Sequence, residues 1–337
     1  VDHADLCAMG LWGKFPGYSL TAEVDADLKE ISPRGTMGSL VVSNFSFANR
    51  QTGSSIALGP LTVSSLRDRG GEAVVELKSD LLEARLAGEY DFAALPAELY
   101  ALIFGKSDLE TRRNKFNITG HIFPEPEFYD FFQIPVKPKH IATIGAGVDS
   151  TRAWFMFSGP YLQRGNKLLK QTSVNVSLAR RIDLLASTMM KTKDGYAALK
   201  FGIVGDSISD TRSNLSWRID RDRDFYGDIV VDTRLSTDPD NGRVVGAGMR
   251  IHPSELVVND SVWQVDPATV AWADGKITVD GLHIGRLNQS VDIAGVAAPD
   301  SASRLDVALK NINLDYIFET LDLGDNLMFG GVATCNV

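Results

Sequence analysis

Residues 197–203 read Ala-Ala-Leu-Lys-Phe-Gly-Ile, and in this stretch Leu199, Phe201 and Ile203 recur at every second position. A period of two is typical of a β-strand that has one apolar face and one polar face. The same period continues through residues 215–219, 229–235 and 245–251. Sheets with one wet face are usually antiparallel. The chain is therefore predicted to be mainly β and to form a long antiparallel meander whose strands turn their apolar sides the same way.

Outside this stretch, similar alternation predicts about sixteen to eighteen strands in all. In the first third of the chain these are residues 41–47, 56–63, 73–77 and 84–90, and strands resume from Ile141. Asp240-Asn241-Gly242 and Asp274-Gly275 are predicted hairpin turns, because these residues tolerate positive φ. Helical spacing of apolar residues predicts three short helices, near residues 92–105, 125–133 and 313–323.

Composition excludes several classes of protein. The chain has 337 residues, of which 44% are hydrophobic, and its formal net charge is −9. Nucleic acid is excluded as the main partner because phosphate binding needs a basic stripe. Cys7 and Cys335 are predicted to be incidental rather than a disulfide. No stretch approaches the roughly 18 apolar residues of a membrane span. We expect residues 1–337 to be one elongated segment of a larger protein.

No arrangement of residues predicts catalysis or metal binding. The five histidines, such as His252 and His283, stand singly along the chain, without the spacing of metal ligands. The acidic residues 220–228 and 238–240 fail as a calcium loop, because Gly242 falls at the fifth position from Asp238 and not at the sixth. We therefore predict no metal, no cofactor and no enzymatic activity.

Two parts of the chain resemble TamB-like proteins of Bacteroidetes. Residues 77–92, Leu-Lys-Ser-Asp-Leu-Leu-Glu-Ala-Arg-Leu-Ala-Gly-Glu-Tyr-Asp-Phe, match a strand of that family which leads into a helix. Residues 275–284, 288–295 and 305–314 resemble a second set of strands followed by a helix. The two matches cover about a quarter of the chain, and the strands between them are compatible with the family but not specific to it.

The resemblance implies an AsmA/TamB-type bridge. Such a bridge is a long β-sheet curved like a taco, with an apolar groove along its length. The family is anchored in the inner membrane and crosses the periplasm. It is thought to pass phospholipid acyl chains toward the outer membrane, often beside a barrel protein of the TamA/BamA type, and thereby to support outer-membrane assembly. The family has no catalytic residues, so the resemblance implies none in this chain. The anchor would lie outside this chain.

On this interpretation the apolar position of each strand lines a lipid groove. The predicted lining residues are Val75, Leu77, Leu86, Val176, Leu178, Leu199, Phe201, Trp217, Val231, Val245, Met249, Val279, Val291 and Val307. We also expect helices 95–104 and 314–321 to pack on the apolar side of the sheet, where their own apolar stripes can be covered.

Three other interpretations stay open at this point. The same residues could fill the dry core of a β-sandwich or a β-solenoid, since alternating strands usually pack that way. The chain could be a structural or adhesive protein of the cell envelope that transports nothing. It could also be a carbohydrate-active enzyme built on a β-sandwich, since two catalytic carboxylates need not be close in sequence.

Overall fold

The chain is described by a computed structural model and is mainly β, as its alternation predicts. The described residues are 4–5, 17–32, 35–67, 72–91, 93–103, 114–149, 152–179, 181–192, 195–220, 224–238, 243–298, 303–313 and 332–336. Within these ranges there are 24 strands and two α-helices, and the strand pairings are antiparallel. The chain separates into two compact units, Val1–Leu102 with Lys106–Ala179, and Ile103–Gly105 with Arg180–Val337.

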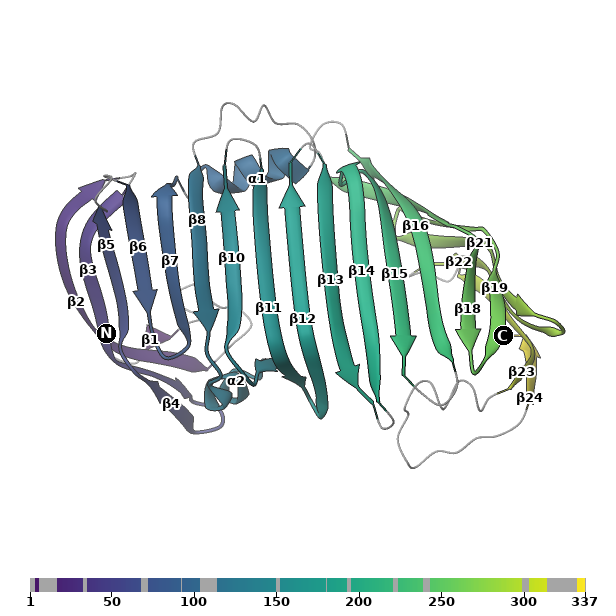
Figure 1. Cartoon of the computed structure of the whole chain (residues 1–337), viewed down its shortest axis with the longest axis horizontal. Coiled ribbons are helices and arrows are strands. Elements are labelled where there is room, and N and C mark those ends of the chain that lie inside the picture. Colours follow the sequence, from purple (N-terminus) through teal and green to yellow (C-terminus); the bar gives the residue numbers. More distant parts are fainter. Residues whose placement is uncertain are drawn as a thin grey trace. The chain divides into compact units, whose positions relative to one another are not determined.

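Unit 1 holds the first half of the meander. Its strands are β1 (Ala4–Asp5), β2 (Tyr18–Ser32), β3 (Gly35–Asn49), β4 (Ser54–Leu58), β5 (Leu61–Arg67), β6 (Ala73–Lys78), β7 (Leu82–Glu89), β8 (Lys115–Ile122), β9 (Val136–Pro138), β10 (Ala142–Val148), β11 (Ala153–Arg164) and β12 (Lys167–Leu178). The long strand β3 pairs with β2 along one edge, and with β5 and then β4 along the other. From β5 onward the order is β5-β6-β7-β8-β10-β11-β12, and Figure 1 shows these strands side by side.

One predicted strand is wrong. Residues 56–63 do not form a single strand, because β4 ends at Leu58 and β5 begins at Leu61. Pro60 lies at the break, and proline has no N–H to give to a strand ladder. The N–H of Gly59 instead donates to Oδ2 of Asp80 at 2.7 Å.

The two helices of unit 1 lie close to their predicted positions. Helix α1 spans Leu95–Ile103 and α2 spans Pro126–Phe131. Asp91 stands before α1, and its Oδ1 accepts from the N–H groups of Ala93 and Ala94 at 3.2 Å. The predicted third helix, 313–323, lies outside the described residues except for Asn313, which ends a strand.

Fully buried Asn114 secures the start of α1. Its Oδ1 accepts from the N–H of Asp91 at 2.7 Å, while its Nδ2 donates to Oε2 of Glu98 at 3.0 Å. The start of the helix is thereby tied to the residue that precedes β8.

Unit 2 continues the meander and contains a fork. Its strands are β13 (Ile182–Lys191), β14 (Tyr196–Ser207), β15 (Asp210–Ile219), β16 (Phe225–Thr237), β17 (Val244–Ile251), β18 (Ser254–Val258), β19 (Ser261–Val265), β20 (Ala268–Ala273), β21 (Lys276–Arg286), β22 (Gln289–Ala297), β23 (Arg304–Asn313) and β24 (Val332–Asn336). Strand β16 pairs with β17 over one half and with β18 over the other. Strand β21 rejoins the two branches, since it pairs with both β20 and β19.

The turns of unit 2 follow their sequences where they are described. Asp274 and Gly275 both have positive φ, 50° and 74°, in the tight turn between β20 and β21. This confirms the predicted Asp-Gly hairpin, because a type I′ turn requires positive φ at both central residues. The predicted turn at 240–242 lies outside the described residues.

Candidate functional site

Each unit has one continuous apolar sheet face. Residues directly opposite each other on paired strands have their side chains on the same side of the sheet, so the registers can be followed from strand to strand. Two such rows cross unit 1. The first is Val63, Leu77, Ala84, Gly120, Ile144, Phe157 and Val174, and the second is Ser65, Val75, Leu86, Ile118, Ala146, Phe155 and Val176.

Helix α1 covers this face of unit 1 at one end of the strands. Its residues Leu95 and Leu99 pack against a buried cluster on the apolar face, whose members are Leu86, Phe116, Val148 and Ala153. These residues stand at the end of β7, the start of β8, the end of β10 and the start of β11. The expectation that this helix packs on the apolar side is therefore confirmed, and the matching expectation for 314–321 lies outside the described residues.

Helix α2 covers the other end of the strands, as Figure 1 shows. Phe132, which directly follows the helix, is 3% exposed and packs with Tyr18, Phe47 and Ile56. The ring centroids of Phe47 and Phe132 are 4.9 Å apart in an edge-on arrangement. In unit 1, α1 thus packs on β7, β8, β10 and β11, whereas Phe132 at the end of α2 packs on β2, β3 and β4.

Unit 2 has similar rows on its apolar face. The clearest are Ala186, Phe201, Leu215 and Ile229; Leu184, Ile203, Ser213, Val231, Ile251 and Ala268; and Thr211, Thr233, Met249, Val270, Val279, Gly295 and Leu305. The next positions along the same strands, such as Lys200, Arg212 and Asp232, fall on the opposite face. These strands therefore carry apolar rows on one face of the sheet and charged residues on the other.

The apolar face of unit 2 is substantially exposed. Phe201 is 38% exposed and Leu215 is 42% exposed, although both lie in the interior of strands, and Leu305 at the start of β23 is 40% exposed. In a sandwich, a second sheet packed about 10 Å away would bury such side chains. Burial is strong only locally, for example at Phe225 and Ala268. The exposure of these side chains argues against a dry sandwich core at these positions.

The fourteen predicted lining residues all lie on strands with an apolar face, five in unit 1 and nine in unit 2. Leu86 belongs to the buried cluster against which α1 packs, and Leu178 contacts that cluster, so a ligand on the apolar face has less access to these two residues. Val245 lies beside a register irregularity at the start of β17. That these residues line a lipid groove stays a prediction. The sequence list missed large members of the same rows, notably Phe155, Phe157 and Leu215, although their alternation was already a sufficient signal.

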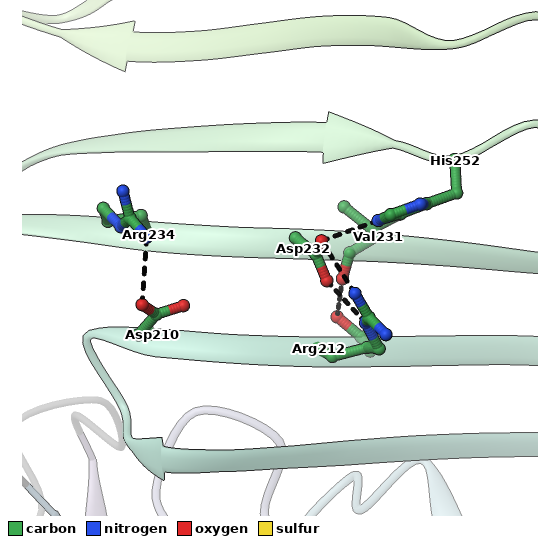
Figure 2. Close-up of polar contacts among 7 residues, drawn as sticks. Asp210, Arg212, Val231, Asp232, Arg234 and His252 are labelled. Carbon is green, nitrogen blue, oxygen red and sulfur yellow. Dashed lines mark hydrogen bonds and ion pairs between the residues drawn. The ribbon is translucent and has the colours of Figure 1, made fainter.

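The opposite face of unit 2 carries a ladder of charged groups (Figure 2). Asp232 on β16 accepts from Arg212 on β15 at 2.6 and 3.1 Å, and its Oδ2 lies 2.6 Å from Nε2 of His252. Arg234 donates to Asp210 at 3.1 Å between the same two strands. The hydrogen bonds from Arg212 and then from His252 hold the pKa of the Asp232 carboxyl well below its usual range. These charged groups suit this face of unit 2 to contact with water.

Metal-ligating side chains do not gather in the part of the chain that the structure describes. No three of its histidine, cysteine, aspartate and glutamate side chains gather as a metal site. Asp228, from the acidic stretch considered for calcium, accepts from Nδ2 of Asn214 at 2.8 Å. None of the described helices is long and apolar enough to cross a membrane. Cys335 carries a free, exposed thiol.

Comparison of the chain with protein-family models, with curated proteins and with solved structures gives no match. The functional interpretation therefore depends on the geometry of the two faces and on the residues that form them.

Proposed function

We propose that the apolar faces of this chain hold phospholipid acyl chains and conduct them along the sheet. The observation that carries this proposal is the row of large apolar side chains left exposed in the interior of β14 and β15, at Phe201 and Leu215, with charged residues on the reverse face. An acyl chain laid on such a row gains about 0.8 kcal/mol for each CH₂ group removed from water. Rows that run from strand to strand offer this gain at many successive positions.

The exposure of these side chains supports acyl-chain binding over a packed core. An exposed apolar patch of more than a few hundred Å² on a soluble protein marks an interaction surface. The apolar face of unit 2 carries further exposed apolar side chains, including Leu199 and Ile277. Acyl chains suit this surface better than a folded partner does, because the rows are long and narrow and have few polar groups to fix a partner's orientation.

The likeness to TamB/AsmA-type proteins extends the proposal. On that basis the chain is a periplasmic segment of an inner-membrane-anchored bridge that conducts phospholipid toward the outer membrane. A barrel protein of the TamA/BamA type would be its partner there. The chain would bind and move lipid without catalysing a reaction, and no cofactor would be involved.

Lipid extraction followed by mass spectrometry tests the proposal. We expect phospholipid to co-purify with the chain, and Leu215→Asp to reduce the bound amount severalfold, because an unpaired charge on an apolar path costs several kcal/mol. Lys200→Asp is the matched control, since Lys200 lies on the opposite face of neighbouring β14. If the chain carries no lipid, or if both variants carry as much as the parent, the acyl-chain function is wrong and a structural or adhesive role becomes the better interpretation.

A further inference from the structure

An open polar depression lies at the fork of unit 2, on the face opposite the apolar rows. It has a volume of about 620 Å³ and lies between β19 and the turn that joins β21 to β22. Strand β19 pairs with β21 only at Gln264 and Val265, which lie opposite Gly285 and Ile284. Because neither the acyl-chain proposal nor the charged ladder of Figure 2 uses this depression, it needs an explanation of its own.

His283 forms the floor of the depression in a defined orientation. Its Nδ1 is hydrogen-bonded to Oδ1 of Asp292 on the neighbouring strand β22, and Oδ2 of Asp292 accepts from Ser290 at 2.8 Å. A carboxylate on one ring nitrogen fixes the tautomer and the orientation of an imidazole. The other nitrogen, Nε2, makes no hydrogen bond to any residue in the described ranges.

Gly285 leaves room for the imidazole ring of His283, because it has no side chain. A Cβ at this position would lie 2.5 Å from Nε2 of His283, so the ring lies across the glycine. Any larger residue would have to displace the ring. Gly285 and His283 both line the depression, and the ring of His283 lies over Gly285.

The charged groups around His283 favour an anion. Lys310 stands opposite Ser290 in the register and lines the depression together with Arg286. The hydrogen bonds from His283 and Ser290, together with the charges of His283 and Lys310, lower the pKa of the Asp292 carboxyl. Asp266 is the one acidic residue among those that line the depression. The cations Arg286 and Lys310 thus stand near two carboxylates, Asp266 and Asp292, and both oxygens of Asp292 are already engaged by His283 and Ser290.

We propose that this depression binds a phosphate group through Nε2 of His283 and the ammonium of Lys310. The ammonium of Lys310 donates to phosphate oxygens, and Nε2 of His283 donates to them when the ring carries a proton on both nitrogens. Charge-assisted hydrogen bonds of this kind are the stronger ones. The phosphate could belong to a lipid headgroup or could be free inorganic phosphate. The site is independent of the acyl-chain function, because it lies on the other face.

The rim of the depression favours a lipid as the source of the phosphate. Leu287, at the tip of the β21–β22 turn, is 93% exposed and has a φ of 52°. Leucine rarely adopts positive φ, and such strain clusters at functional sites. Val262 is a second exposed apolar residue on the rim. A headgroup held at His283 would place the glycerol and acyl region beside these two side chains.

Titration with inorganic phosphate tests the site directly. We expect saturable shifts of the His283 ring signals in NMR spectra of the full chain at low salt. His283→Gln and Lys310→Gln should each weaken binding at least tenfold, and Gly285→Val should abolish it by displacing the ring. His252→Gln is the matched control, since His252 also pairs with an aspartate but its Nε2 is already engaged. Absence of saturable binding, or equal binding by His283→Gln and the parent, would overturn the proposal.

A further measurement separates the two sources of the phosphate. Vesicles with 30% anionic phospholipid should bind the parent but bind Leu287→Ser at least fivefold more weakly, while phosphate binds both equally. If vesicles fail and phosphate binds, the source is free phosphate.

Discussion

At the scale of single residues, exposure separates side chains that the sequence pattern treats alike. Phe201 on β14 and Phe225 on β16 both occupy apolar positions in unit 2, yet Phe201 is 38% exposed and Phe225 is 8% exposed. Alternation of apolar and polar residues predicts which face a side chain occupies but not what covers it. Whether the apolar face is an open surface or a packed core can therefore be tested by substituting an exposed and a buried member of such a pair.

Phe201→Asp should leave the chain folded, with a melting temperature within a few degrees of the parent, because the new carboxylate still reaches water. Phe225→Asp should lower the melting temperature strongly, since burial of an unpaired charge costs several kcal/mol. Circular dichroism of both variants during heating checks this contrast. A Phe201→Asp chain that melts as early as Phe225→Asp would mean that Phe201 belongs to a packed core.

Asp232 should make stability depend on pH in the acid range. Its pKa is lowered in the folded state by Arg212 and His252, so its stabilising contribution is fully present above the ordinary aspartate pKa of about 4 and is lost as the pH falls toward the lowered value. Asp232→Asn should therefore melt below the parent at pH 7, and the difference should shrink below about pH 4. The effect is modest because the pair is exposed. A difference that stays constant down to pH 2.5 would contradict this account.

At the scale of elements, the helices of unit 1 are held by their apolar contacts and not by their length. Helix α2 has only six residues, too few to be stable alone, and Phe132 anchors it on β2, β3 and β4. Phe132→Ala should cost about 3–5 kcal/mol and lower the urea midpoint accordingly. Phe155→Ala is the matched control, because Phe155 is 42% exposed and should cost about 1 kcal/mol or less. Equal midpoints for the two variants would show that α2 is not anchored through Phe132.

Sequence reasoning predicted the strand type well but not every boundary. The period of two found β3, β6, β7 and most strands of unit 2, and helical spacing found α1 and α2 within a few residues. Strand β2 was missed, because charged residues dominate its second half, where Glu23, Asp25 and Asp27 alternate with exposed apolar residues. The fork at β16 was also missed, since pairing of one strand with two partners is a tertiary arrangement that leaves no local pattern.

The candidate sites differ in how far the sequence could predict them. The apolar lining follows from alternation, so most of its members could be named in advance. The phosphate site could not be predicted in this way. His283 and Lys310 are 27 positions apart in the sequence, and only the register of β21, β22 and β23 brings them to the same depression. A histidine that stands alone in the sequence can still be oriented by a cross-strand carboxylate, as Asp292 shows.

At the scale of the whole molecule, each of the two units has an apolar sheet face. In each unit the rows cross several strands, while the reverse face of unit 2 carries ion pairs such as Arg212 with Asp232. A chain with such faces must keep them from associating in water, and bound lipid would do so. Lipid should then act as a ligand that stabilises the folded chain by mass action.

We therefore expect the melting temperature of the delipidated full chain to rise with added short-chain phospholipid below its micelle concentration. At a ligand concentration 100 times the Kd the stabilisation would be about 2.7 kcal/mol, which corresponds to a shift of a few degrees. Glycerophosphocholine, which has the headgroup but no acyl chains, is the control and should produce no shift through the apolar faces. The shift should survive 0.5 M salt, because burial of apolar surface is not screened, whereas phosphate binding at His283 should weaken. A salt-sensitive shift, or one that glycerophosphocholine reproduces, would assign the stabilisation to the headgroup site and leave the apolar faces without a ligand.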